Sequence, residues 1–219
     1  MTKPRPEPAG REARLSRASA GRFSLYLRHL ERFEQEGLTT VSSSQLGEAL
    51  GITHAQVRKD LANLGHLGQP GIGYPTHELI WALRRRFGID REWAVVVVGV
   101  GNLARALLRY RGFRDQGFRF AALFDADTRK VGQRAEGLEI MAMERLGEIV
   151  RSTGANLGLV TVPAEAAQTV ADALVAAGVR GILNFAPIVL RLPAEVSLVN
   201  VDLAIQLEQL AFLVHLAGK

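Results

Sequence analysis

Hydrophobic and polar positions follow two different patterns along the chain. In residues 21–88, apolar side chains recur at helical spacing in short segments separated by polar turns. From Trp93 onward, short apolar runs typical of buried strands alternate with helical segments, which is the signature of a parallel α/β sheet. We therefore expect two domains that meet near residues 88–92.

The N-terminal pattern predicts a bundle of short helices. A first helix is predicted over residues 23–33, and Gly37 is placed to end it. Ser42 and Gln45 have capping-box spacing for a second helix, and Thr53 can cap a third helix after a three-residue turn. Two short helices joined by a tight turn are a helix-turn-helix candidate.

The third predicted helix has an inward and an outward face. Val57, Leu61 and Leu64 share the inward face. The outward side is predicted to carry Gln56, Lys59 and Asn63, with Arg58 on its flank. The outward side is therefore the candidate recognition surface.

Residues 65–75 contain four glycines and two prolines, which exclude a helix and favour a β-hairpin wing. Thr76–Phe87 resumes a helical pattern. Together these segments predict a winged-helix domain over residues 21–88. The preceding residues 1–20, rich in Pro, Gly, Ala and Arg, predict a flexible basic arm.

A dinucleotide-binding fingerprint opens the second domain. The apolar run Ala94–Val98 predicts a buried strand, and it is followed by Gly99-Val100-Gly101-Asn102-Leu103-Ala104 and a helix expected through Arg111. Gly99 permits a tight turn, Gly101 lets the backbone approach a pyrophosphate, and the helix N-terminus offers free N–H groups to phosphates. The strand, turn and helix in this order predict a Rossmann domain over residues 92–200.

Asp125 is placed to select the nucleotide. It ends a second predicted strand, Phe118–Phe124, 24 residues after Gly101, and can accept hydrogen bonds from both adenosine ribose hydroxyls. This favours NADH and NAD⁺, although Arg129 and Lys130 leave a 2′-phosphate, and so NADP(H), as an alternative.

Two further predicted strands end in candidate ligand segments. One leads into Thr161-Val162-Pro163 and the other into Asn184-Phe185-Ala186-Pro187. Ligands of doubly wound sheets bind at the carboxyl ends of the strands, so we expect both segments to line the nucleotide site.

Composition excludes several classes of site and favours one class of partner. The chain has no cysteine, which excludes disulfides and thiolate metal sites, and no apolar run long enough to predict a membrane span. The excess of basic residues behind the net charge of +5 lies entirely in residues 1–91, as a nucleic-acid-binding module would require.

The chain closely resembles the Rex family of redox-sensing repressors over nearly its whole length. The resemblance rests on Gln56-Val57-Arg58-Lys59-Asp60-Leu61, Gly71-Ile72-Gly73-Tyr74, Gly99-Val100-Gly101-Asn102-Leu103, Phe124-Asp125-Ala126-Asp127, Thr161-Val162-Pro163, Asn184-Phe185-Ala186-Pro187 and Val201-Asp202-Leu203. The chain departs from the family at Ala62-Asn63-Leu64, where Ser-Tyr-Phe is common.

The resemblance implies a cytoplasmic repressor that binds inverted-repeat operator DNA as a homodimer and is released by NADH. It implies an α/β fold with an N-terminal winged helix-turn-helix domain, a C-terminal Rossmann domain with a doubly wound, mostly parallel sheet, and a C-terminal helix over residues 201–219 swapped between protomers. It assigns DNA contacts to Ser43, Ser44, Gln56, Arg58, Lys59, Gly71, Gly73 and Tyr74.

The resemblance also suggests a switch. Arg28 is expected to pair with Asp202 in the open, DNA-competent dimer, and Tyr110 is expected to engage Asp202 in a closed dimer that NADH favours.

Two rival functions share the fingerprint. The first is an NAD-dependent dehydrogenase, but all five histidines lie outside the predicted nucleotide site, none has metal-ligand spacing, and no catalytic constellation is evident. The second is the CoA-binding domain of acyl-CoA ligases, which lacks a winged helix. We therefore predict that the chain is not an enzyme and holds no metal.

Overall fold

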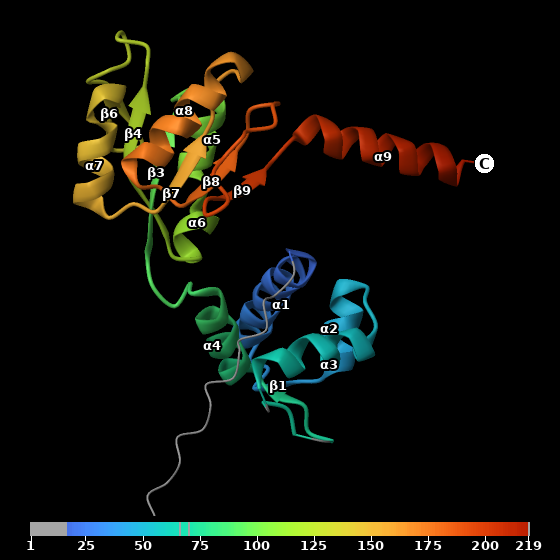
Figure 1. The fold of residues 1–219 in the computed structure, drawn as a ribbon. Coiled ribbons are helices and arrows are strands. Elements are labelled where there is room, and N and C mark those ends of the chain that lie inside the picture. Colours follow the sequence, from blue (N-terminus) through green and yellow to red (C-terminus); the bar gives the residue numbers. More distant parts are fainter. Residues whose placement is uncertain (1–16, 66, 70, 219) are drawn as a thin grey trace, which may run out of the picture. The chain divides into compact units, whose positions relative to one another are not determined.

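The computed structural model describes residues 17–65, 67–69 and 71–218. The chain forms two compact units, Met1–Asp90 and Arg91–Lys219 (Figure 1). Most of the basic arm expected at residues 1–20 lies outside the described residues, but its last part differs from expectation because the first helix begins at Arg17.

The first unit contains the predicted helix-turn-helix. Its elements are α1 (Arg17–Gln35), β1 (Thr40–Val41), α2 (Ser43–Leu50), α3 (His54–Leu61), the 3₁₀ turn η1 (Ala62–Leu64), β2 (Tyr74–Pro75) and α4 (Thr76–Phe87). Ser42 and Gln45 form both hydrogen bonds of the capping box, and the Thr53 side chain accepts from the backbone of Gln56. The local polar pattern therefore determines where α2 and α3 begin.

The wing is less regular than a hairpin. Among its described residues, pairing is limited to one bridge between Gln69 and Gly73, and β2 pairs with β1 instead. Gly73 makes this possible, because its φ is +106° and a Cβ there would lie 2.6 Å from the Val41 carbonyl oxygen.

The second unit is built on a sheet. Its elements are β3 (Trp93–Val98), α5 (Asn102–Arg109), α6 (Arg111–Asp115), β4 (Phe118–Asp125), β5 (Arg134–Ala135), β6 (Leu138–Ala142), η2 (Met143–Arg145), α7 (Leu146–Thr153), β7 (Leu157–Val160), α8 (Ala164–Ala177), β8 (Gly181–Asn184), β9 (Ser197–Asn200) and α9 (Leu203–Ala217). The seven strands are ordered β5-β6-β4-β3-β7-β8-β9, and every pair except β5–β6 is parallel. The order reverses at β3, so the carboxyl ends of β3, β4 and β7 meet at the position where such sheets bind ligands.

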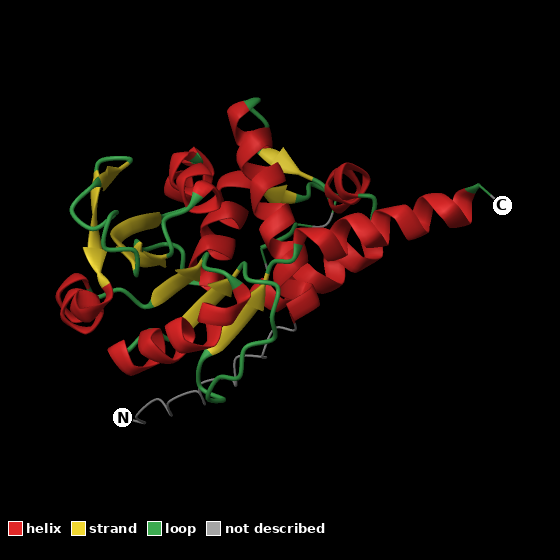
Figure 2. Ribbon diagram, turned by 90° about the horizontal axis from the view of Figure 1, so that it is seen from above, coloured by secondary structure: helices red, strands yellow, loops and turns green. Residues whose placement is uncertain are grey.

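Helices cover the two faces of this sheet unequally (Figure 2). On one face, α7 and α8 pack their apolar side chains over Val96, Val98 and Ile182. On the other face, α5 and α6 pack over β3 and β4, while the surface toward β7, β8 and β9 forms an apolar cavity of about 340 Å³. Leu157, Leu183 and Val199 are among the residues that line this cavity.

The helix after the fingerprint is shorter than expected. It ends at Arg109 instead of continuing through Arg111, because Tyr110 has an extended backbone and separates α5 from α6. The Tyr110 ring packs edge-on against Phe113, with 5.4 Å between ring centroids, which holds the break.

The terminal helix α9 is predominantly apolar. Every one of its 15 residues is exposed, including Leu207 and Phe212. In the part of the chain that the structure describes, no helix combines the length and apolar character that crossing a bilayer requires.

Candidate functional site

The turn between β3 and α5 requires glycine twice, for two different reasons. Gly99 has a φ of +92°, and a Cβ there would lie 2.5 Å from Val162 Cγ1 and 2.7 Å from the Thr161 carbonyl oxygen. A Cβ on Gly101 would meet no heavy atom within 4 Å, and Gly101 is exposed. Gly99 is therefore required by the fold, whereas Gly101 keeps open a space that a ligand can occupy.

The N-terminus of α5 faces the same turn. Gly101 is its N-cap and no side chain accepts a hydrogen bond from the first turn. Asn102 and Leu103 are exposed, and Ala104 is fully buried against the sheet. The first N–H groups of α5 are thus available to a phosphate, as the sequence predicts.

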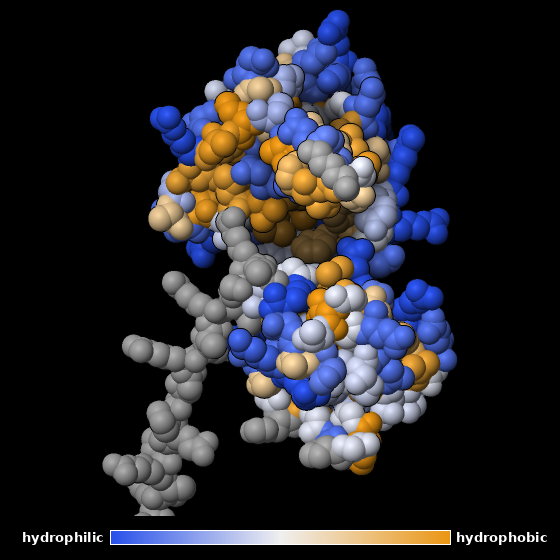
Figure 3. All heavy atoms as spheres, turned by 90° about the vertical axis from the view of Figure 1, so that its right-hand side faces the viewer, coloured by the Kyte–Doolittle hydropathy of each residue, from blue (hydrophilic) through white to orange (hydrophobic). Residues whose placement is uncertain are grey.

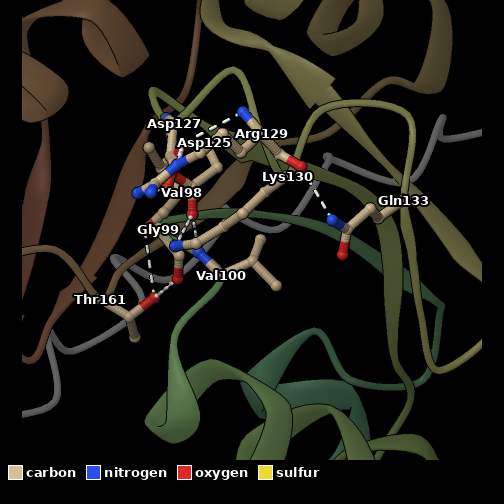
Figure 4. Close-up of polar contacts among 9 residues, drawn as sticks. All are labelled: Val98, Gly99, Val100, Asp125, Asp127, Arg129, Lys130, Gln133 and Thr161. Carbon is tan, nitrogen blue, oxygen red and sulfur yellow. Dashed lines mark hydrogen bonds and ion pairs between the residues drawn. The ribbon is translucent and has the colours of Figure 1, made fainter.

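Asp125 stands at the end of β4 beside this turn (Figure 4). Its Oδ2 accepts hydrogen bonds from the Val100 N–H and the Lys130 Nζ, both at 2.8 Å, and its Oδ1 accepts from the Asp127 N–H at 2.9 Å. Burial raises the pKa of Asp125, but these three hydrogen bonds outweigh burial and hold the pKa below its ordinary value. The carboxylate is charged at neutral pH and fixed in orientation.

The cations near Asp125 are paired within the site. Lys130 binds Asp125, and Arg129 forms two side-chain hydrogen bonds of 2.9 Å with Asp127. The Arg129 guanidinium lowers the pKa of Asp127 to about 2. Two carboxylates therefore balance two cations, which leaves no surplus positive charge for a 2′-phosphate.

Thr161 joins the end of β7 to the glycine turn. Its hydroxyl donates to the carbonyl oxygens of Gly99 at 2.7 Å or Val98 at 3.1 Å. Val162 contacts the position above Gly99, and Pro163 is the N-cap of α8. The predicted segment therefore supports the turn directly.

Asn184 has a different position from the one expected. It is fully buried, its Nδ2 lies within hydrogen-bond distance of the Ala186 carbonyl and Asn200 Oδ1 at 3.0 Å, and its Oδ1 accepts from the Ala186 N–H. Its side chain thus supports the loop that carries Phe185, Ala186 and Pro187. Pro187 is exposed, while Phe185 is half-buried.

A separate polar groove lies on the first unit. Its volume is about 470 Å³, and it brings together Ser42, Ser43, Arg58, Gly68, Gln69, Gly71, Ile72, Gly73 and Tyr74. Arg58 Nη1 lies 3.5 Å from Ser43 Oγ, so the recognition helix and the N-terminus of α2 meet here. Ser44 and Lys59 are exposed but do not line the groove.

Gln56 differs from the predicted outward position. It is half-buried, and its Nε2 donates to Asp60 Oδ1 at 2.8 Å. Asp60 itself is buried against α1. No sequence pattern assigned a site role to Asp60, although an aspartate between the inward residues Val57 and Leu61 was a signal that a partner must exist.

Two residues that sequence reasoning did not assign also belong to these sites. Ile72 is 62% exposed at the tip of the wing, and Lys130 holds the Asp125 carboxylate. Exposure and pairing depend on the fold, so periodicity could not identify either role.

The expected switch residues are accessible. Arg28 is exposed on α1, and Tyr110 is 52% exposed at the break between α5 and α6. Asp202 is the N-cap of α9, where its Oδ1 accepts from the backbone of Ala204 and Ile205. Among the described residues, no group of three or more His, Asp or Glu side chains could hold a metal ion.

Family models match both parts of the chain. A model described as a CoA binding domain matches residues 90–188, and one described as a putative DNA-binding protein N-terminus matches residues 14–62. The second match lies over the helix-turn-helix, which the CoA-binding domain of acyl-CoA ligases lacks.

Relatives and solved structures match nearly the whole chain. The redox-sensing transcriptional repressor Rex of Desulfitobacterium hafniense is 43% identical over 91% of this chain and 95% of its own. The Rex protein of Streptomyces coelicolor is 43% identical over 94% of this chain and 80% of its own.

The crystal structure of RSP in complex with beta-NAD⁺ and operator DNA is 33% identical, with a TM-score of 0.88 over 93% of this chain and 94% of that one. The complex of RSP with beta-NADH has a TM-score of 0.84 at 32% identity, covering 94% of this chain and 97% of that one. With relatives of this similarity covering both units, the chain belongs to the Rex family of redox-sensing transcriptional repressors.

Proposed function

We propose that the chain is a transcriptional repressor that binds inverted-repeat operator DNA as a homodimer, senses the NADH/NAD⁺ ratio and is released from DNA by NADH. The observation that carries this proposal is the presence, in one chain, of a dinucleotide turn anchored on Asp125 and a helix-turn-helix groove. Similarity to repressors solved with NADH, NAD⁺ and operator DNA supports the same function.

The groove of the first unit is the proposed DNA-binding surface. Arg58 and Lys59 on α3 contact base edges and phosphates in the major groove, and the wing around Gly71, Gly73 and Tyr74 enters the minor groove. Ser43 and Ser44, at the N-terminus of α2, donate to a phosphate. Gln56 contributes chiefly by holding Asp60, since its amide nitrogen already donates to that carboxylate.

The second unit is the proposed NAD(H) site. The backbone of residues 99–103 takes the pyrophosphate at the start of α5, and Asp125 takes the adenosine ribose with support from Lys130. Residues 161–163 and the loop 185–187 border the remaining space at the strand ends. When bound, the nicotinamide supplies the redox signal, because its ring is cationic when oxidised and neutral when reduced.

A second copy of this chain completes the fold. The second unit leaves an apolar cavity of about 340 Å³ beside β7, β8 and β9, and α9 is apolar with every residue exposed. Hydrophobic side chains gather on the face shown in Figure 3. A helix that is predominantly apolar needs burial of its apolar side chains, and exchange of α9 between two protomers provides it.

Asp202 is the proposed exchange point of the switch. In the described residues its Oδ1 accepts both cap hydrogen bonds, so Oδ2 is available to Arg28 in the DNA-competent dimer. In the NADH-favoured dimer, Tyr110 donates to the carboxylate instead. A repressor needs no catalytic group, and we assign none to this protein. We place its action in the cytoplasm, where the operator lies.

The test is a DNA-binding titration at fixed salt. A fluorescent duplex carrying an inverted repeat, selected by the protein from a random pool, is followed by anisotropy with NADH, NAD⁺ or NADPH added separately. We expect tight binding that NADH releases and NADPH does not. Absence of sequence-selective binding, or binding indifferent to all three nucleotides, would refute the proposal and favour a dehydrogenase.

A further inference from the structure

Among the residues that the structure describes in the first unit, Asp60 is the only buried carboxylate, with 3% of its surface exposed. It lies on the recognition helix α3, directly after Arg58 and Lys59, which are both exposed. An ionised side chain is costly to bury unless it is paired, so a buried aspartate at this position must have partners.

Four donors converge on the Asp60 carboxylate. Its Oδ2 accepts from Arg22 Nε at 2.6 Å and from the Tyr26 hydroxyl at 2.8 Å. Its Oδ1 accepts from Arg22 Nη2 and from Gln56 Nε2, both at 2.8 Å. Two carboxylate oxygens can accept about four hydrogen bonds, so the group is saturated and its plane is fixed.

These contacts keep Asp60 charged and Tyr26 protonated. Burial raises the pKa of Asp60, but its hydrogen bonds with Arg22, Tyr26 and Gln56 hold the pKa below its ordinary value. Burial and the nearby carboxylate raise the pKa of Tyr26, so its hydroxyl is a permanent donor. The network therefore has the same protonation state throughout the neutral pH range.

The network joins two helices with different tasks. Arg22 and Tyr26 are one turn apart on α1, while Asp60 is on α3. Successive side chains on a helix are about 100° apart, so fixing the direction of Asp60 also fixes the directions of Lys59 and Arg58. On α1, Arg28 follows Tyr26 by two residues and is exposed.

We propose that Asp60 is a positioning residue for operator recognition: through Arg22 and Tyr26 it sets the rotation of α3 about its axis and ties the recognition helix to the helix that carries Arg28. This inference rests on the proposed function. It assigns Asp60, Arg22 and Tyr26 no contact with DNA.

The test uses Tyr26→Phe, which removes one donor and almost no buried volume. We expect operator binding about tenfold weaker. The slope of log affinity against log salt should stay at the wild-type value, because no phosphate contact is lost. Affinity for random-sequence DNA and for NADH should also be unchanged, so that only the ratio of specific to non-specific binding falls.

Two further variants keep the result decisive. Arg22→Lys retains the charge but loses the two-pronged contact with Asp60, so it should weaken operator binding in the same way. It serves as the test if Tyr26→Phe folds poorly. Glu31→Gln weakens the Glu31–Arg84 ion pair, which joins α1 to α4. It should lower the Tm without changing the specificity ratio.

Specific affinity within twofold of wild type in both folded network variants would overturn the positioning role while leaving the proposed function intact. A specificity ratio that falls equally in Glu31→Gln would also overturn it, since general destabilisation would then explain the effect. If the wild-type protein selects no sequence at all, the proposed function itself fails.

Discussion

At the scale of single residues, the two glycines of the fingerprint illustrate how one motif contains two kinds of constraint. At Gly99 the φ is positive and a Cβ would collide with Val162 and Thr161, whereas Gly101 has an ordinary φ of −95° and open space around it. The motif predicts a tight turn at Gly99 and close approach of a pyrophosphate at Gly101. The surroundings separate a requirement of the fold from a requirement of the ligand.

This difference predicts opposite outcomes for matched substitutions. Gly101→Ala should leave the free energy of unfolding nearly unchanged but weaken NADH binding by tenfold or more, because the methyl group enters the space left for the pyrophosphate. Gly99→Ala should destabilise the fold by about 1–3 kcal/mol, because its backbone is strained and its Cβ has no room.

Urea unfolding and NADH titration by tryptophan fluorescence measure both quantities. NADH affinity at the wild-type level in Gly101→Ala would contradict the proposed approach of the pyrophosphate to this turn.

Buried polar residues were the hardest to assign from sequence. Asp125 could be placed from its distance to the glycine motif, but its partner Lys130 was considered only as a phosphate ligand. Asn184 was expected to line the cofactor site, and no sequence pattern predicted that its side chain would hold its own loop. Asp60 pairs with residues 34 and 38 positions earlier, and no local pattern reports such a contact.

At the scale of elements, local signals determined most helix boundaries. α4 spans Thr76–Phe87 as the periodicity predicts, and α2 and α3 begin after the expected caps. The break at Tyr110 was missed, because it depends on ring packing against Phe113. The described part of the wing closes on an antiparallel bridge between Gln69 and Gly73, and β2 also pairs with β1, which the sequence pattern did not predict.

The N-terminus of α9 offers a prediction at this scale. Asp202 caps the helix and is the proposed switch residue, and asparagine caps a helix as well as aspartate does. Asp202→Asn should therefore keep the thermal stability of the protein but lower the NADH concentration needed for release from the operator, because it loses the charge pair with Arg28 that belongs to the DNA-competent dimer. Asp202→Ala should show the same shift and, in addition, lose about 1 kcal/mol of helix stability.

Circular dichroism melts and anisotropy titrations separate these effects. Release of Asp202→Asn at the wild-type NADH concentration would exclude the carboxylate charge from the switch.

At the scale of the whole molecule, the apolar cavity and the exposed α9 both leave apolar surface in contact with water. A single chain leaves both the sheet surface near Val199 and the side chains of Leu207 and Leu210 in water. The proposed dimerisation through α9 would cover both, and two copies of the winged-helix unit would match an inverted repeat. Shifting the ratio of the two dimer forms from 1:99 to 99:1 requires NADH to bind one form about 10⁴-fold more tightly than the other.

Charged substitutions on α9 test this assembly. Leu207→Glu combined with Leu210→Glu should yield a monomer and weaken operator binding at least a hundredfold, because two charges would have to be buried and the second half-site would be lost. Gln206→Glu combined with Gln209→Glu adds the same charge to polar positions of the same helix and should remain dimeric.

Light scattering after size exclusion gives the mass of each variant. A dimeric mass for the leucine variant would show that α9 does not form the interface.

The sequence by itself determined the two-domain organisation, the helix caps, the parallel strands and the fingerprint, because these features depend on residues close together in the chain. It could not determine which distant groups meet. The saturation of Asp60, the pairing of Lys130 with Asp125, the internal role of Asn184 and the uncovered sheet face were decided only by tertiary structure, since each depends on contacts or burial that arise when separate elements pack together.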